Sequence, residues 1–466
     1  RRLIASCSSA SALSPLKCIS LSSISLSMGD LNEDQVKALA SIRDFLSQAD
    51  RRQMVLYGAA GTGKTSLINV LLDELDKDPD SPVYYCTAPT NKAVDVIAER
   101  TGRDFDRTIY SLLGLTLLDF TDGRPKLKKE NESHLQDYDL VIVDEASMVS
   151  LALLNEIQRQ LLIYTSIKVI YVGDRCQIPP VDDANNGMLE SIIFQLPWQV
   201  ELTKVMRTAA ENPILGAVTA MRADMKSPVD LFKHETAVAP DGTGIYFYPL
   251  QRPFMNKMLE YFKRDEFKED SSYAMAVAYT NAAVDAINEQ VRSVLYPDCT
   301  RTIEVGEEVR VVKTYGNNIV RGQSTFFSVL YNVEERLRVL EIEDVEDPSY
   351  HIKCYKVKVK NLVRKKAKQS TATAYIIAPE GMNDYMVQKE KLAVEAREKA
   401  NALNARGHHI YTPREAWKEY SAFTKFYLWF GYIYALTAHK SQGSTIQKAA
   451  APDCTADTYP LLYGLP

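Results

Sequence analysis

The sequence predicts an α/β protein built on parallel sheets with flanking helices. Apolar strands alternate with helical segments, and each strand ends in polar residues. That order is typical of a parallel sheet whose ligand lies at the carboxyl edge of the strands. The strand at 54–57 runs into a glycine-rich loop, the strand at 140–143 ends in Asp144-Glu145, and the strand at 169–172 ends in Gly173-Asp174.

The glycine-rich loop at 58–65 matches the phosphate-binding pattern G-x-x-x-x-G-K-[ST]. Its glycines let backbone N–H groups face a polyphosphate, and the helix that opens after it adds the positive end of its dipole. Strand, loop, Lys and Thr are all in register, which argues against a chance glycine-rich turn. Lys64 is expected to reach the β- and γ-phosphates of ATP. The expected nucleotide-binding residues are Gly58, Ala59, Ala60, Gly61, Thr62, Gly63, Lys64, Thr65 and Ser66.

The acidic pair Asp144-Glu145 is the expected partner of this loop. A lone Asp-Glu pair is usually a solvated turn, but here it follows an all-apolar strand and lies downstream of Lys64. Phosphoryl transfer needs positioning and charge neutralisation more than covalent chemistry. We therefore expect Thr65 and Asp144 to hold Mg²⁺, and Glu145 to orient and deprotonate the attacking water.

Length and composition set the broad class. With 466 residues, 46% hydrophobic and 25% charged, the chain is expected to form about three domains. Its net charge of -5 gives no overall positive field, so any nucleic-acid site must be a local groove. Seven cysteines without a C-x-x-C pair disfavour zinc and disulfides and fit a reducing compartment. The expected location is cytoplasmic, in a bacterial or phage-infected cell. No apolar run is long enough for a membrane span, so no membrane partner is expected.

Residues 1–27 differ from the rest, because they are rich in serine, contain no acidic residue and precede the first methionine, Met28. One interpretation is an organellar transit peptide or a secretory signal. We favour the other, in which residues 1–29 are upstream sequence or a disordered tail.

Several further elements follow from local patterns. Asn32 is a candidate N-cap with Gln35 at the third helical position. Asp122-Gly123 predicts a β-hairpin over about 110–135. Valine-rich alternation over 305–380 predicts a small antiparallel barrel. A charge-mixed helix is expected over 383–406, ended by Gly407, and the aromatic residues from 423 to 434 are interpreted as core rather than as a DNA-stacking surface.

Seven segments occur in the order of a superfamily 1B helicase, and the chain resembles the Dda-like, RecD-like and Pif-type DNA helicases. They are Gln35, the loop at 58–65, and the strings APTNKA at 88–93, DEASM at 144–148, GDRCQIPPV at 173–181, LTKVMR at 202–207 and LTAHKSQGST at 436–445. The resemblance covers almost all of the chain from 31 to 445. It implies RecA-like domains at 30–210 and at 211–304 plus 431–466, an SH3-like barrel at 305–380 and a helical insertion at 381–430.

The resemblance also implies roles for individual nucleotide-site residues. Gln35 would read the adenine edge through paired amide hydrogen bonds, and Gln177 would sense the γ-phosphate and couple it to the DNA groove. Arg207 resembles the arginine finger, whose planar fork suits transition-state charge. Gly443 joins the nucleotide-binding set.

Two strings resemble single-strand contacts, one in each domain, that grip phosphates without reading sequence. Their residues are Pro89, Thr90 and Asn91, and Thr437, His439, Lys440 and Ser441. Related helicases carry a strand-separating pin at the position of the predicted hairpin. Phe120 near its tip is a candidate to stack on the first base pair, the alternative being that it packs on its own hairpin.

The resemblance implies an ATP-dependent 5′→3′ DNA helicase, expected to be a monomer or weakly associating, that acts on single-stranded and forked duplex DNA beside single-strand-binding or replication proteins. The chain departs from the family at its end, where 461–463 is not followed by the usual arginine motif. We expect from this that the closing strand is lost and that hydrolysis is impaired. The alternatives are an RNA helicase of the Upf type and an ATP-gated single-strand binder impaired in hydrolysis.

Overall fold

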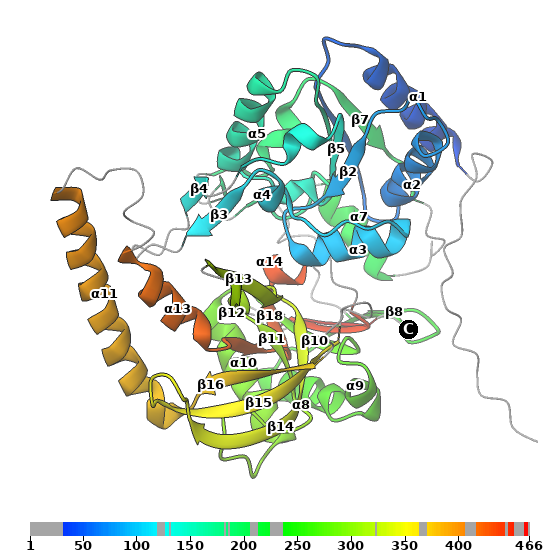
Figure 1. Ribbon diagram of the computed structural model, residues 1–466. Helices are drawn as coiled ribbons and strands as arrows, with labels where there is room; N and C mark the ends of the chain where they lie inside the picture. The colour runs from blue at the N-terminus through cyan, green and yellow to red at the C-terminus, as the bar shows by residue number, and fades with distance from the viewer. Residues whose placement is uncertain are drawn as a thin grey trace, which may run out of the picture.

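Two α/β lobes and an antiparallel β-structure make up the part of the chain that the computed structural model describes (Figure 1). The described residues are 31–118, 126–129, 132–180, 183–184, 187–205, 213–223, 236–321, 324–362, 371–405, 416–442, 446–451 and 461–464.

The first lobe is built on a five-stranded sheet in the order β2-β5-β6-β1-β7, and its pairings are parallel throughout. The strands are β1 (Gln53–Gly58), β2 (Tyr84–Thr87), β5 (Leu140–Val143), β6 (Lys168–Gly173) and β7 (Gln199–Leu202). The helices are α1 (Glu33–Ser47), α2 (Lys64–Leu75), α3 (Asn91–Thr101), α4 (Ile109–Leu112) and α5 (Leu151–Ile163). This is the predicted RecA-like α/β architecture.

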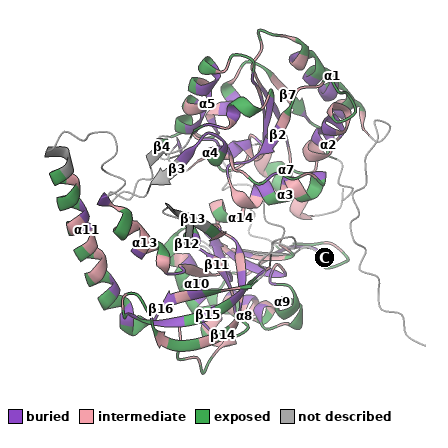
Figure 2. Cartoon of the chain, viewed as in Figure 1, coloured by how far each residue is buried: buried purple, intermediate pink, exposed green. Residues whose placement is uncertain are grey.

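Local sequence explains why these elements form where they do. All four residues of β5 are buried, as expected for a central strand of a parallel sheet covered on both faces. Figure 2 shows the same buried interior beneath the helices. The helix α1 begins with the predicted capping box, in which the Asn32 and Gln35 side chains each bond the other's backbone N–H.

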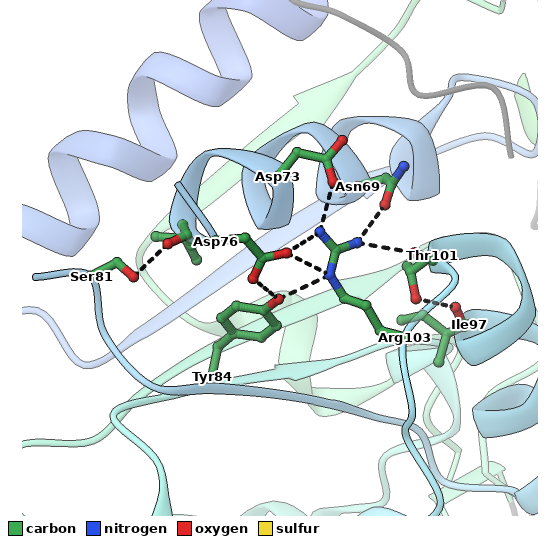
Figure 3. A network of polar contacts seen from close by, with 9 residues as sticks. Asn69, Asp73, Asp76, Ser81, Tyr84, Ile97, Thr101 and Arg103 are labelled. Carbon is green, nitrogen blue, oxygen red and sulfur yellow. Dashed lines mark hydrogen bonds and ion pairs between the residues drawn. The ribbon is translucent and has the colours of Figure 1, made fainter. Parts of the chain in front are cut away.

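An arginine holds α2, β2 and the end of α3 together (Figure 3). The Arg103 guanidinium donates to Asp73 at 2.7 Å, to Asp76 at 2.5 Å and to Asn69 at 2.9 Å, all on or next to α2. It also donates to the Tyr84 hydroxyl of β2 at 2.9 Å. Burial, and then the hydrogen bond to Asp76, raises the pKa of Tyr84 to about 12. This network fixes the helices at the edge of the sheet where β2 begins.

The second lobe has a six-stranded sheet in the order β18-β10-β19-β20-β9-β8. Its strands are β8 (Ala237–Val238), β9 (Gly244–Phe247), β10 (Ala274–Ala278), β18 (Ala435–Thr437), β19 (Lys448–Ala451) and β20 (Leu461–Gly464). Its helices are α7 (Pro213–Ala223), α8 (Gln251–Phe262), α9 (Asp265–Glu269) and α10 (Asn281–Leu295).

Two expectations about this lobe were wrong. The sheet is mixed rather than parallel, because β18, β10 and β19 pair parallel whereas β20, β9 and β8 pair antiparallel. The closing strand is not lost, since Leu461–Gly464 pairs with both β19 and β9. Strands of only two to five residues do not reveal their direction of pairing in the sequence.

An antiparallel sheet follows the second lobe in the predicted barrel region and is called the insert sheet below. Its order is β16-β15-β14-β11-β17, with strands β11 (Glu308–Val311), β14 (Arg336–Glu346), β15 (Lys353–Asn361), β16 (Thr371–Ile377) and β17 (Phe430–Tyr432). A separate ribbon pairs β12 (Tyr315–Arg321) with β13 (Ser324–Tyr331). Alternating valines of β15 are buried, which is the period of two that the sequence predicted.

The predicted helix after the insert sheet is α11 (Met382–Ala405), and α13 (Lys418–Phe426) packs beside it. Phe423, Tyr427 and Tyr434 are buried, which confirms that the aromatic run is mainly core. The predicted hairpin is β3 (Leu115–Leu118) paired antiparallel with β4 (Lys126–Lys129), whereas its tip, with Phe120, lies outside the described residues.

Among the helices that the structure describes, none combines the length and the apolar character that crossing a bilayer requires.

Candidate nucleotide site and interlobe cleft

The phosphate-binding loop follows β1 and ends at the first residue of α2, as predicted. Gly61 and Gly63 both have φ of +82°, in the left-handed region that glycine tolerates. A Cβ on Gly63 would lie 2.2 Å from Nε2 of Gln35, so the loop also needs glycine there for space. Lys64 Nζ donates to the carbonyls of Gly58 at 2.8 Å and Ala59 at 3.1 Å. These carbonyls hold the ammonium group across the concave face of the loop. A bound polyphosphate would replace them as its partner.

Gln35 is only 3% exposed and lies behind the loop. Its Nε2 donates to the Thr62 carbonyl at 3.1 Å, and its Oε1 accepts from the Asn32 backbone at 3.0 Å. Both ends of the amide are therefore engaged, Nε2 in linking α1 to the loop and Oε1 in the capping box of α1. Its role in adenine recognition stays a prediction, and paired bonds to adenine would require these two contacts to open.

Three carboxylates face Lys64, namely Asp144, Glu145 and Asp174. Burial lowers the pKa of Lys64, and the three carboxylates oppose this shift. Burial likewise raises the pKa of Asp144, and the Glu145 backbone N–H, which donates to Asp144 Oδ1 at 2.9 Å, opposes that shift. Clustered titratable groups with shifted pKa values are typical of functional sites.

Glu145 has a strained backbone, with φ of +49° in a residue that carries a side chain. Such outliers concentrate at functional sites, where the surroundings hold them in place. Burial and the neighbouring Asp144 raise the pKa of Glu145, whereas a hydrogen bond with Gln177 lowers it. Gln177 also accepts from the Ser147 hydroxyl at 2.5 Å. The structure thus brings the predicted base Glu145 and the predicted sensor Gln177 into contact.

The donor set fits Mg²⁺ bound together with a nucleotide. No group of three or more His, Cys, Asp or Glu side chains that could hold a metal alone occurs in the part of the chain with described coordinates. Mg²⁺ commonly takes one or two protein oxygens and completes its shell with phosphates and water. Thr65, in the first turn of α2, and Asp144, at the end of β5, are the oxygens that would serve here.

Three predicted site residues, Arg207, Gly443 and Phe120, lie outside the described residues.

A pocket of about 190 Å³ opens between the lobes and is called the interlobe cleft. Its lining residues come from α3, from β11 and the turn before β14, and from the segment around β18. They are Asn91, Lys92, Asp95, Val96, Glu99, Arg310, Val333, Glu334, Glu335, Arg336, Ile433, Leu436 and Lys440. The cleft therefore contains one member of each predicted single-strand string, Asn91 and Lys440.

The other predicted strand contacts lie beside these two. Thr90 caps α3 and accepts from Ala93 N at 3.2 Å, and Pro89 before it is buried. Thr437 caps the one-turn helix α14 (Ala438–Ser441) in the same way. The Ser441 hydroxyl donates to the Ala438 carbonyl at 2.9 Å. His439 Nε2 is buried without a hydrogen-bond partner among the described residues.

Sequence reasoning missed several residues that the structure places at these sites. Asp174 and Arg222 form an ion pair beside Lys64, and Arg310 and Arg336 line the cleft. Separately, residues 278–287 repeat seven of the ten residues at 88–97, including Thr and Asn at the helix start. Thr280 caps α10 exactly where its counterpart Thr90 caps α3, and Tyr279 before it is 81% exposed. A search for internal repeats would have found this second segment.

A loop next to Gln177 joins the two sites. Gln442, which follows α14, donates through Nε2 to the Ile178 carbonyl at 3.4 Å. The loop of the first lobe that carries Gln177 and the strand-contact string of the second lobe are therefore in direct contact. A P-loop site between two α/β lobes, linked to a cleft lined by both, defines the class as a two-lobed P-loop NTPase.

Comparisons with known proteins agree with this class. A family model described as "AAA domain" matches residues 30–239. The ATP-dependent RecD2 DNA helicase of Deinococcus radiodurans is 34% identical over 213 residues, which are 46% of this chain and 27% of that protein. The ATP-dependent DNA helicase dda of Enterobacteria phage T4 is 24% identical over 320 residues, which are 68% of this chain and 69% of that helicase. The crystal structure of Bacteroides Pif1 bound to single-stranded DNA aligns with 92% of this chain and 87% of its own, at 16% identity and a TM-score of 0.46.

In its ordered motif series and in its sequence relatives, the chain is similar to the superfamily 1B helicases. The chain spans 27% and 39% of the first two curated relatives that it matches.

Proposed function

We propose that the protein is an ATP-dependent 5′→3′ DNA helicase that translocates on single-stranded DNA. The observation that carries this proposal is the interlobe cleft, which is lined from both lobes by the predicted strand contacts Asn91 and Lys440. The Gln442–Ile178 contact connects the string that contains Lys440 to the loop that carries Gln177. The 5′→3′ direction rests on the resemblance to the family.

Each nucleotide-site residue has a role in this proposal. Lys64 leaves its loop carbonyls to hold the β- and γ-phosphates, and Glu145 accepts a proton from the attacking water while Gln177 orients that carboxylate. Mg²⁺ on Thr65 and Asp144 would neutralise developing phosphate charge. Arg207 is assigned the arginine-finger role and Gly443 a nucleotide contact from the second lobe.

The strand would cross both lobes. Thr90 and Asn91 hold it on the first lobe, and Thr437, His439 and Lys440 hold it on the second, so that opening and closing of the cleft shifts one grip against the other. Tyr279, exposed beside β18, adds a surface on which a base can stack. The insert sheet is assigned the role of the SH3-like domain that closes over the strand, and the hairpin that of the pin, with Phe120 at the fork.

The test measures phosphate release and strand separation with the purified chain. We expect single-stranded DNA to stimulate phosphate release and a duplex with a 5′ tail to be unwound. Absence of stimulation by any strand would overturn the motor assignment. Stimulation by RNA alone would overturn the DNA assignment, and unwinding only of 3′-tailed duplex would overturn the direction. Strand binding without hydrolysis would identify the chain as an ATP-gated binder instead.

Glu334 is expected to weaken strand binding in the interlobe cleft. The cleft carries four cationic side chains, from Lys92, Arg310, Arg336 and Lys440, and four acidic ones, from Asp95, Glu99, Glu334 and Glu335. Glu334 has φ of +69° and pairs with Arg310 at 3.0 Å, where a DNA phosphate would compete for the same guanidinium. Glu334→Gln removes the competing charge and keeps the shape of the side chain.

We expect Glu334→Gln to tighten binding of a labelled oligothymidylate about fivefold at low salt, because a half-buried ion pair is worth about 1 kcal/mol. Fluorescence anisotropy at several salt concentrations measures the effect. Glu341→Gln is the matched control, because Glu341 pairs with Lys358 on the exposed side of the insert sheet. Equal affinities of the two variants would contradict the prediction.

A further inference from the structure

Arg222 connects a helix that contacts the second sheet to the nucleotide site. It lies on α7, which contacts β9 of the second sheet. Its Nη1 donates to both oxygens of Asp174, at 2.9 Å and 2.7 Å. Asp174 directly follows β6 of the first sheet, and its side chain is only 5% exposed. The ion pair therefore connects the end of β6 in the first sheet to a helix that contacts β9 of the second sheet, at a point that faces Lys64.

Asp174 shapes the turn that carries Gln177. Its carboxylate accepts from the Cys176 backbone N–H at 3.0 Å, and its carbonyl accepts from the Gln177 N–H at 3.1 Å. Gln177 continues the chain of contacts to Ser147 and Glu145. A change in the position of Asp174 therefore changes the position of Gln177 and of the carboxylate it orients.

The geometry points to Arg222 as a positioning residue for ATP hydrolysis, which holds Asp174 so that the turn at 174–177 places Gln177, and which links that placement to the position of α7. This inference rests on the proposed function for its kinetic consequence. It does not require Arg222 to touch the nucleotide. Gln442 of the second lobe donates independently to the carbonyl of Ile178 in the same loop. Two separate contacts therefore hold this loop.

The central test is Arg222→Gln in the full chain. We expect the DNA-stimulated kcat to fall about 10- to 100-fold, because small misplacements of catalytic groups have effects of this size, while KM for ATP changes less than about threefold. Arg222→Lys, which keeps the charge with fewer donors, should recover part of kcat. A merely structural role would lower the melting temperature and leave kcat per folded molecule unchanged, and that result would overturn the inference.

Asp174→Asn provides a second route to the same contact. If the two residues act as one unit, the double variant Arg222→Gln/Asp174→Asn should lose no more kcat than the worse single variant. Multiplicative losses would show that the two side chains act separately and would overturn the link. Arg397→Gln is the matched control, since Arg397 forms an exposed ion pair with Glu390 within α11. It should behave like the parent.

Hydrogen exchange separates this inference from the proposed function, since it needs no hydrolysis. On addition of a nonhydrolysable ATP analogue, the amides of α7 should change their exchange rate in the parent and not in Arg222→Gln, at equal occupancy of the analogue. If the parent binds the analogue but no strand stimulates hydrolysis, the proposed motor fails while the link stands. If α7 responds equally in both proteins, the link fails whatever the activity.

Discussion

Lys64→Ala is expected to reduce DNA-stimulated ATP hydrolysis at least about 100-fold, the scale on which a single preorganised electrostatic group acts. In the structure its ammonium group lies between the carbonyls of Gly58 and Ala59 and faces the carboxylates of Asp144, Glu145 and Asp174. Without it, those carboxylates would repel an incoming polyphosphate with no cation from the loop to offset them. Phosphate release in the presence of excess single-stranded DNA measures the loss.

Lys77→Ala is the matched control for this prediction, because Lys77 is exposed just beyond the other end of α2. Both variants should melt at about the parent temperature, because neither side chain is part of the core. Hydrolysis by Lys64→Ala within a few fold of the control would remove this loop as the nucleotide site, whatever the strand-binding behaviour.

Glu307→Ala is expected to destabilise the junction of the second lobe and the insert sheet by about 3–5 kcal/mol, because it leaves a charged partner unpaired in a buried site. Glu307 is fully buried and accepts from Arg292 Nε of α10 at 3.1 Å. It also accepts from the Tyr434 hydroxyl at 3.0 Å and from the Glu304 backbone at 3.0 Å. Denaturant unfolding followed by intrinsic fluorescence measures the loss.

Asp344→Ala is the control, because the Arg301–Asp344 pair on β14 is exposed and should contribute little. Glu307→Gln should fall between the two, since it keeps hydrogen-bonding atoms but not the charge. The prediction fails if Glu307→Ala and Asp344→Ala unfold at the same denaturant concentration.

Much of the first lobe was predictable because its signals are local. The strand 140–143, the Asn32 capping box and the glycine loop each depend on residues within a few positions of one another. Strand direction in the second sheet was not predictable in this way. The strands β20 and β9, which pair antiparallel there, are short and lie far apart in the chain, and β8, which pairs with the neighbouring β9, has only two residues.

The candidate site likewise has residues that the sequence predicted and contacts that it did not. Lys64, Asp144, Glu145 and Gln177 could be named from their strings, and the structure brings them together at one edge of the first sheet. The capping bond of Gln35 with Asn32 is local and was predictable, whereas its bond to the Thr62 carbonyl depends on how α1 packs behind the loop.

By itself, the sequence determined that the chain is a P-loop protein with a superfamily 1B motif series, because short spacings are enough to specify a phosphate loop, a strand end and a helix cap. Only the tertiary structure decided that Arg222 meets Asp174 and that Arg310 and Glu334 share a cleft with Lys92 and Lys440. The physical reason is that ion pairs and clefts depend on the approach of segments distant in sequence, which is set by the packing of whole sheets and helices.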